Sequence, residues 1–373
     1  MRIGILTLPL HTNYGGILQA YALQTVLERM GHDVVVFDTP RVTFRLPLWK
    51  KPLVYGKRLI KKYVMGNKST LVFFERKINR DYPVAAKNTQ RFISQYIHAK
   101  HVSSLGSLNA EEFDAIVVGS DQIWRPKYYP KIENAYLEFA KHWNIKRIAY
   151  AASFGTDKWE YTTWQTERCG KLIKMFNGVS VREDSAVGMC REHFGVEAKH
   201  VLDPTMLLDK EDYIKLFTNA KTPGSKGTLL CYVLDETPEK SALIQQIAQE
   251  RKLTPFRVNS KVEDPFAPLN ERIQPPVEKW LRGFYDAEFV VTDSFHACVF
   301  SILFGKQFLV VGNAKRGLSR FNSLLCMFGL EDRLVTKNLD MKNITDIDYS
   351  QVYQRLKGKR DNSLNFLDKS LGL

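Results

Sequence analysis

The sequence contains few cysteines, and their spacing does not suit a metal site. Five occur among 373 residues, far apart and without a CxxC pair: Cys169, Cys190, Cys231, Cys298 and Cys326. This argues against a disulfide scaffold and a zinc site, and it favours reduced, packed thiols in a cytosolic protein. HExxH, EF-hand and Walker motifs are also missing, so we expect neither a metal nor a cofactor.

Long hydrophobic runs are absent as well. None approaches the roughly 20 residues that cross a bilayer. The first ten residues carry one arginine and a short apolar run without a small-residue cleavage site, so we expect a core strand there rather than a signal peptide. Apolar residues make up 44% of the chain and charged residues 25%. This composition is typical of a folded protein of two or three domains and excludes disordered and collagen-like classes.

Acidic residues are missing from one segment of this basic chain. Residues 41–68 hold nine Lys or Arg and no Asp or Glu, in a chain whose net charge is +14. Apolar and aromatic residues are interleaved with the basic ones. The segment fits either a solvated insertion that packs on its domain or an amphipathic surface for an anionic membrane or glycan. Nucleic acid is less favoured, because no nucleic-acid-binding module accompanies the charge. We expect a cytoplasmic protein, with peripheral contact at the inner face of the membrane as the second interpretation.

Short apolar runs alternate with helical periodicity along the chain, which predicts parallel sheets covered on both faces. In the first half we expect strands at 2–7, 33–37, 113–118, 147–152 and 178–182, and helices at 17–29, 161–175 and 183–194. In the second half we expect strands at 228–234, 255–259, 288–292 and 307–311, and helices at 238–252, 276–286, 295–304 and 319–328. The fold class is therefore α/β, with two Rossmann-like domains facing a cleft. We place their bounds at 1–204, with the basic insertion at 41–68, and at 205–345. The tail 346–373 has a helix near 349–357 that is expected to pack back on the first domain.

Polar residues follow several of these strands, at the edge where open α/β sheets bind ligands. The first strand leads through residues 11–16 (HTNYGG) into a helix. The glycines and N–H groups of this loop suit either a bound anion or a simple tight turn. The strand at 113–118 leads to Asp121, Trp124 and Arg125. These residues suit a sugar platform with polar anchors, or alternatively a turn with a capping aspartate.

Cationic residues follow other strands. Arg182 comes directly after residues 178–181 and can bind a phosphate or carboxylate, or instead form an ion pair with a neighbouring acidic residue. In the second half, Ser294 and His296 follow the strand at 288–292, which places His296 in the first turn of a helix. A histidine at a strand-to-helix junction beside a cleft suits acid/base work, with a structural role as the alternative. Further basic residues follow the next strand: Lys315, Arg316 and Arg320.

An ordered set of motifs resembles the polysaccharide pyruvyl transferase family. The matching segments are Asn13-Tyr14-Gly15-Gly16 with the helix that follows, VGSDQIWRP (118–126), YAASFG (150–155), SVREDSAV (180–187), VLDPTMLL (201–208), residues 290–311 and residues 319–333. They are spread over roughly residues 1–335. The resemblance implies a fold similar to the two-domain GT-B glycosyltransferases. It also implies phosphoenolpyruvate as donor and a sugar hydroxyl pair as acceptor, giving a pyruvate ketal and free phosphate. A lipid-linked oligosaccharide as acceptor would account for the basic segment 41–68.

The resemblance also implies residue roles. Arg182 matches the family arginine expected to hold the donor, and His296 matches the family histidine. Some members carry arginine at the position of Ser294, and we hypothesise that Arg316 or Arg320 replaces that charge here. The full assignment is His296 and Asp121 as catalytic residues, Arg182, Arg316, Arg320, Ser294, Gly15 and Gly16 as donor-binding residues, and Asn13, Tyr14, Trp124 and Arg125 as acceptor-binding residues. The alternatives are a GT-B-type glycosyltransferase that uses a nucleotide sugar and an inactive glycan-binding relative.

Overall fold

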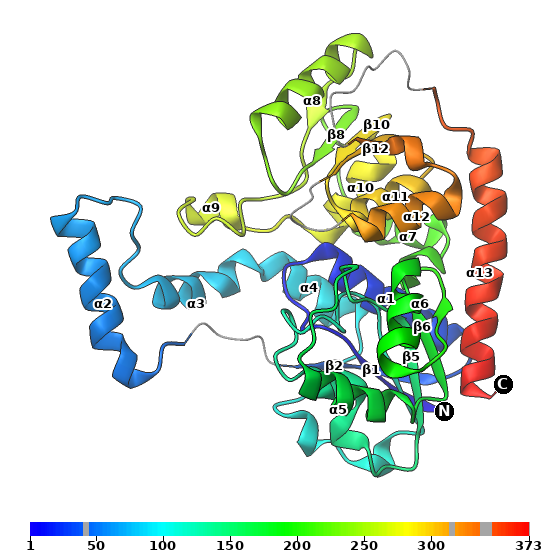
Figure 1. Cartoon of the computed structure of the whole chain (residues 1–373). Coiled ribbons are helices and arrows are strands. Elements are labelled where there is room, and N and C mark those ends of the chain that lie inside the picture. Colours follow the sequence, from blue (N-terminus) through cyan, green and yellow to red (C-terminus); the bar gives the residue numbers. More distant parts are fainter. Residues whose placement is uncertain (40–44, 313–317, 336–344, 373) are drawn as a thin grey trace.

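The structure, a computed structural model, describes residues 1–39, 45–312, 318–335 and 345–372. It contains two parallel sheets, each covered by helices and stacked one above the other in Figure 1. The first sheet has seven strands in the order β3-β2-β1-β4-β5-β6-β7. Their bounds are β1 Arg2–Leu6, β2 Asp33–Asp38, β3 Ala99–His101, β4 Ala115–Val118, β5 Lys146–Ala152, β6 Gly178–Val181 and β7 Lys199–His200.

The second sheet has five strands in the order β12-β11-β10-β8-β9. Their bounds are β8 Leu229–Tyr232, β9 Pro255–Phe256, β10 Phe289–Thr292, β11 Gln307–Val311 and β12 Leu334–Val335. All pairs in both sheets are parallel. The central strands β4, β8 and β10 are buried along their whole length, as expected for apolar runs covered on both faces. The α/β class with two Rossmann-like domains is confirmed.

Helices connect the strands and cover both sheets (Figure 1). Their bounds are α1 Tyr14–Arg29, α2 Lys51–Leu59, α3 Phe74–Ala85, α4 Lys87–Tyr96, α5 Thr163–Ile173, α6 Asp184–Met189, α7 Lys210–Asn219, α8 Pro238–Glu250, α9 Leu269–Arg272, α10 Val277–Asp286, α11 Phe295–Leu303, α12 Ser319–Phe328 and α13 Tyr349–Leu371. The sequence did not predict the helices α2, α3, α4, α7 and α9 or the short strands β3, β7 and β12, and α13 is much longer than the expected 349–357. Short 3-10 and π turns complete the connections.

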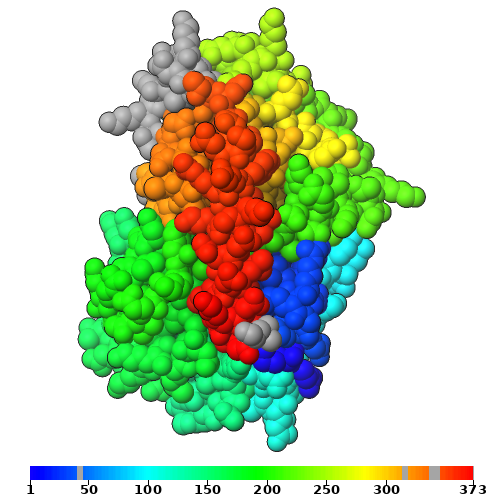
Figure 2. Space-filling view, turned by 90° about the vertical axis from the view of Figure 1, so that its right-hand side faces the viewer, coloured from blue at the N-terminus to red at the C-terminus, as the bar shows by residue number. Residues whose placement is uncertain are grey.

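The C-terminal helix α13 ties the two halves together. Figure 2 shows it running as one column over the second domain and down along the first. Near its end, the Leu371 carbonyl accepts a hydrogen bond from Lys146 of β5. In its middle, the Ser363 hydroxyl accepts from the Leu202 N–H at 3.0 Å. The Arg360 guanidinium donates to the Met206 carbonyl at 2.9 Å. The chain therefore crosses to the second domain and returns to pack on the first.

Contacts between the domains fix the way that they face each other. Tyr14 at the start of α1 donates its hydroxyl to the Pro275 carbonyl at 2.7 Å, and its ring stacks on Trp280 at 5.3 Å between centroids. A buried ion pair joins Asp81 of α3 to Arg272 of α9 at 2.9 Å. These contacts hold the ligand-binding edges of the two sheets on opposite sides of one cleft.

The five cysteines are free thiols. Four of them are buried, as expected, whereas Cys326 on α12 is exposed. No helix in the described part of the chain combines the length and apolar character needed to cross a membrane.

Candidate active site

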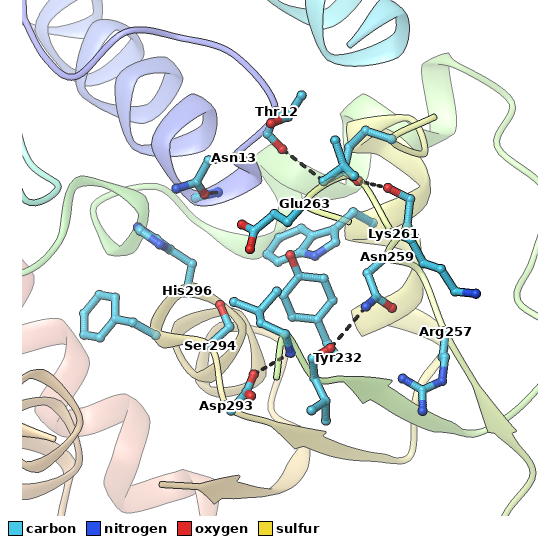
Figure 3. A pocket seen from close by; sticks show the side chains of 18 of the residues that line it. Thr12, Asn13, Tyr232, Arg257, Asn259, Lys261, Glu263, Asp293, Ser294 and His296 are labelled. Carbon is cyan, nitrogen blue, oxygen red and sulfur yellow. Dashed lines mark hydrogen bonds between the residues drawn. The ribbon is translucent and has the colours of Figure 1, made fainter. Parts of the chain in front are cut away.

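A cleft of about 910 Å³ lies between the domains, at the carboxyl ends of strands from both sheets. Figure 3 shows its two walls. The start of α1, with Thr12 and Asn13, forms one wall, and the ends of β8 and β10, with Tyr232 and His296, form the other. Residues that follow β9 close one side: Arg257, Asn259, Ser260, Lys261, Val262, Glu263 and Asp264. The cleft is thus built from segments far apart in the sequence, as the strand-end argument predicts.

His296 reaches across this cleft and packs against the first domain. It lies in the first turn of α11, with 7% of its surface exposed. A Cβ atom placed on Gly15 would lie 2.0 Å from Nδ1 of His296. Only glycine leaves room for the imidazole at this position. Gly15 therefore contributes space for the ring.

Asp203 holds the other edge of the same imidazole. Its Oδ2 lies 3.5 Å from Nε2 of His296, and it accepts hydrogen bonds from Nη1 of Arg182 at 2.7 Å and from the Ser120 hydroxyl at 3.1 Å. Its Oδ1 accepts the N–H and hydroxyl of Thr205 at 3.0 and 2.6 Å. A buried carboxylate beside an imidazole fixes the orientation of the ring, as in acid/base sites generally.

The surroundings of Asp203 keep it ionised. Burial acts to raise the pKa of its carboxyl group, but the neighbouring His296, the charge of Arg182 and the hydrogen bond from Thr205 outweigh this effect. The pKa of Asp203 is therefore well below its ordinary value. An ionised carboxylate therefore lies against the imidazole of His296.

Two guanidinium groups gather around Phe295, the neighbour of His296. The guanidinium carbon of Arg182 lies 4.5 Å from the centroid of the Phe295 ring, and that of Arg320 lies 5.7 Å from it. Nε and Nη2 of Arg182 and Nε of Arg320 are buried without a hydrogen-bond partner among the described residues. Burial and the nearby Arg182 charge lower the pKa of Arg320 to about 10, so both groups remain cationic at neutral pH. Unpaired buried donors of this kind suit a phosphate or carboxylate.

A model of the polysaccharide pyruvyl transferase family matches residues 13–315. The chain belongs to the polysaccharide pyruvyl transferase family. In a comparison with curated protein sequences, none matches it significantly.

Solved structures resemble this chain at low sequence identity. UGT89C1 of Arabidopsis thaliana, complexed with UDP-L-rhamnose, has a TM-score of 0.52 and 10% identity, covering 100% of this chain and 99% of that one. UDP-GlcNAc 2-epimerase from Neisseria meningitidis, bound to UDP-GlcNAc, has a TM-score of 0.48 and 8% identity, covering 99% and 97%. The first likeness confirms the GT-B-like architecture of this pyruvyl transferase family member.

Several residues predicted for the site do lie at the cleft. Asp121, Ser294, Arg320, Gly15 and Asn13 all line it. Asp121 has a φ of 68°, an uncommon backbone conformation that often marks functional sites. Its Oδ1 is 3.8 Å from Nη2 of Arg182.

The loop before α1 differs from the predicted anion site. Oδ1 of Asn13 accepts hydrogen bonds from the N–H groups of Gly15 at 3.0 Å and Gly16 at 3.3 Å. Two of the helix-start N–H groups that were expected to bind the donor are therefore occupied by the helix cap. The role of this loop in the cleft is steric at Gly15, and the exposed Asn13 side chain faces the opening.

Three residues predicted for acceptor binding lie elsewhere. Trp124 is fully buried, stacks on Tyr136 at 4.9 Å and donates its indole N–H to the Ala135 carbonyl, so it offers no face to a sugar. Tyr14 is buried at the domain junction described above. Arg125 donates two hydrogen bonds to the Glu160 carboxylate at 2.9 and 2.7 Å and does not line the cleft. Aromatic and cationic side chains at a strand end can thus be core or ion-pair residues.

Arg182 lies behind Phe295, 4% exposed, and pairs with Asp203, not with a neighbouring acidic residue. Arg182 therefore neutralises and positions the Asp203 carboxylate, and it does not line the cleft. Its Nε and Nη2 groups have no hydrogen-bond partner among the described residues. Arg316 and Lys315 lie outside the described residues.

Sequence reasoning missed Asp203 and the wall that follows β9. Asp203 follows the two-residue strand β7, and an acidic residue at a strand end was the available signal. The wall offers hydrogen-bonding groups such as those of Asn259, Lys261 and Glu263, which surround the cleft in Figure 3. The sequence also shows that polar residues follow the strand expected at 255–259. The apolar pattern of that strand is weak, so it did not draw attention to the residues after it.

Proposed function

We propose that this protein transfers the enolpyruvyl group of phosphoenolpyruvate onto two hydroxyls of a sugar, forming a pyruvate ketal and free phosphate. Membership of the pyruvyl transferase family supports a polysaccharide acceptor. The observation that carries the donor assignment is the buried guanidinium of Arg320, which lines the cleft against Phe295 beside His296 and whose Nε has no hydrogen-bond partner among the described residues. Phosphoenolpyruvate brings a phosphate and a carboxylate, which are the acceptors that such donors require.

The reaction needs proton transfers that His296 is placed to perform. One sugar hydroxyl adds to C2 of the enol, its proton is removed, and C3 gains a proton to become a methyl group. The second hydroxyl then forms the other C2–O bond as the bond from C2 to the phosphate oxygen breaks, and its proton leaves with phosphate. His296 transfers these protons and Asp121 assists, while Asp203 orients the imidazole. The proposed mechanism uses side chains and no cofactor.

The donor and acceptor occupy different parts of the cleft in this proposal. The donor phosphate lies near Arg320 and Ser294, beside His296. The sugar lies toward Asn13 and the wall after β9, where Asn259 and Glu263 present polar groups to its hydroxyls. Both substrates then meet at the imidazole, which stands between the two walls.

Incubation of the protein with phosphoenolpyruvate and a panel of oligosaccharides tests the proposal. We expect one acceptor to gain the mass of a pyruvate ketal, with one phosphate released for each ketal formed. Phosphoenolpyruvate should also raise the melting temperature, because it binds the folded state. A rise with a nucleoside diphosphate and none with phosphoenolpyruvate would favour a nucleotide-sugar transferase. Acceptor binding without donor binding would favour an inactive glycan-binding relative.

Arg320 is expected to supply the charge that some relatives carry at the position of Ser294. The Arg320→Ala variant should bind phosphoenolpyruvate about tenfold to a hundredfold more weakly, since it loses a charge-assisted hydrogen bond. Arg257→Ala is the matched control, because it removes a guanidinium from the other side of the same cleft. Titration calorimetry measures both affinities. If Arg320→Ala and Arg316→Ala both bind the donor normally, the compensation hypothesis is wrong.

A further inference from the structure

One part of the molecule stands away from both domains. Residues 45–73, which we call the arm, contain α2 and a π turn that continues it from Ile60 to Val64. Figure 1 shows α2 projecting at the far left, joined to the body through α3. No residue of the arm from 45 to 71 is buried. The interpretation of this segment as an insertion packed on its domain is therefore wrong for the described residues.

Specific contacts give the arm its shape despite this exposure. Arg58 donates two hydrogen bonds to the Glu75 carboxylate of α3 at 2.8 and 2.9 Å. This pairing raises the pKa of Arg58 and lowers that of Glu75, so both are charged at neutral pH. The Tyr55 ring packs edge-on against Phe73 at 5.1 Å between centroids. One side of α2 is thereby fastened to the segment that leads into α3.

The other side of the arm presents large apolar side chains to solvent. Trp49, Leu53, Ile60 and Val64 are 76%, 61%, 55% and 78% exposed. Their intervals of four, seven and four residues bring them to one side of a helix. Leu48, Tyr63 and Met65 are also exposed, by 78%, 72% and 72%. An apolar group of this size on the surface of a folded protein marks a binding surface.

The charge of the arm is of one sign. It carries eight basic residues and no acidic ones: Arg45, Lys50, Lys51, Lys57, Arg58, Lys61, Lys62 and Lys68. Among the described residues, Arg58 is the member of this set that forms an ion pair. Lys50 lies 4.7 Å from the Trp49 ring and Lys62 lies 5.6 Å from the Tyr63 ring, so cationic and aromatic groups share the same surface.

We propose that the arm docks the protein on an anionic lipid bilayer. Apolar and aromatic side chains enter the interface between headgroups and acyl chains, while the lysines around them contact anionic headgroups. Exposed apolar side chains or basic side chains alone would not identify the partner. Their combination on one projecting helix suits an anionic membrane surface. A second copy of the chain is less suited as the partner, because two arms of the same strong positive charge repel each other.

Docking through the arm would place the cleft near the bilayer. The arm joins α3, and Asp81 of α3 forms the buried ion pair with Arg272 of α9. Glu271 of α9 lines the cleft and pairs with Lys261 at 2.8 Å. Helix α3, to which the arm is joined, is therefore fixed to the segment that forms one wall of the proposed acceptor site. An acceptor anchored in the same membrane would then be presented to that wall.

Vesicle sedimentation of the full chain tests the proposal without donor, acceptor or turnover. The protein should pellet with vesicles that contain phosphatidylglycerol and stay in the supernatant with pure phosphatidylcholine. Raised salt should weaken the binding. The triple variant Lys57→Glu, Lys61→Glu and Lys68→Glu should bind anionic vesicles at least about tenfold more weakly, because each lysine near the surface adds to the attraction.

Matched variants separate the arm from the overall charge. Lys171→Glu, Lys174→Glu and Lys226→Glu change the net charge equally at exposed sites on the body and should leave binding unchanged. Trp49→Ser should weaken binding, whereas Trp164→Ser, which removes a tryptophan 61% exposed on α5, should not. The proposal would be wrong if the protein pelleted equally with both vesicle types. It would also be wrong if the body variants lost as much vesicle binding as the arm variants. Light scattering that shows a dimer converted to monomer by the arm variants would likewise overturn it. These experiments measure membrane binding and no reaction. Their outcome therefore neither supports nor contradicts the proposed function, which is tested separately.

Discussion

Replacing His296 with alanine is expected to lower turnover by about a hundredfold to ten-thousandfold, the usual range for the loss of a general acid/base. The imidazole is the proton-transfer group that Asp203 orients and that Gly15 leaves room for. It lies at a wall of the cleft, so its removal should spare the fold. Phosphate release from phosphoenolpyruvate in the presence of acceptor measures the activity, and thermal unfolding measures the stability. Near-normal turnover in His296→Ala would remove His296 from the mechanism.

A pair of adjacent glycines tests the position of the same imidazole from the opposite wall. A Cβ on Gly15 would lie 2.0 Å from Nδ1 of His296, so Gly15→Ala should displace the ring and reduce turnover strongly. A Cβ on Gly16 would come no closer than 3.4 Å, to Oδ2 of Asp121, which is an ordinary contact. Gly16→Ala should therefore keep most of the activity. If the two variants are equally active, His296 does not work in the position that the structure gives it.

Much of the architecture could be predicted because the strands are short, continuous apolar runs. The runs at β4, β8 and β10 lie at the positions that the sequence indicates, and each strand is buried throughout. Helices α3, α4 and α7 were missed because polar residues predominate in them and no long apolar run marks them, and α3 even contains Pro83. Their helicity is stabilised by tertiary contacts such as the Asp81–Arg272 pair, which a local pattern does not reveal.

The candidate site was predicted unevenly, for a geometric reason. Strand ends gave the right locations for Asp121 and His296, because parallel strands bring their carboxyl ends to one edge. The direction of each side chain is set by packing instead. Trp124 follows the same strand as Asp121 yet lies in the core against Tyr136. The role of Asp203 depends on partners from three distant segments of the chain. The residues that surround Asp203 in the sequence do not show which side chains it contacts in the fold.

Replacing Asp203 with asparagine is expected to reduce both stability and turnover. The carboxylate is buried and neutralises Arg182, which lies against it at 2.7 Å. Breaking a buried ion pair by removing one partner costs about 3–5 kcal/mol of unfolding free energy, since it leaves the other charge uncompensated. Turnover should fall as well, because the imidazole of His296 loses the group that orients it. Denaturant unfolding and phosphate release measure the two effects.

Ser120→Ala is the matched control for this loss. The Ser120 hydroxyl donates to Oδ2 of Asp203 at 3.1 Å and accepts from Nη1 of Arg182 at 3.2 Å, so its removal deletes hydrogen bonds to charged groups but leaves the ion pair itself. The cost should be about 1.5–3 kcal/mol, the range for hydrogen bonds to charged groups, and smaller than the loss of the ion pair. An Asp203→Asn variant no less stable than Ser120→Ala would show that the charge of Asp203 does not hold the site together.

The pH dependence of stability gives a third measurement of the same carboxylate. The folded pKa of Asp203 lies below its ordinary value of 3.8, so the folded state favours the charged form. Its stabilising contribution is therefore complete above the unfolded pKa and is lost as the pH falls toward the folded one. The stability difference between the natural protein and Asp203→Asn should stay constant from neutral pH to about pH 5 and shrink below about pH 4. If the difference stays unchanged in acid, the asparagine variant is destabilised by lost packing and not by the lost charge. In that case Asp203 does not act on His296 as an anion.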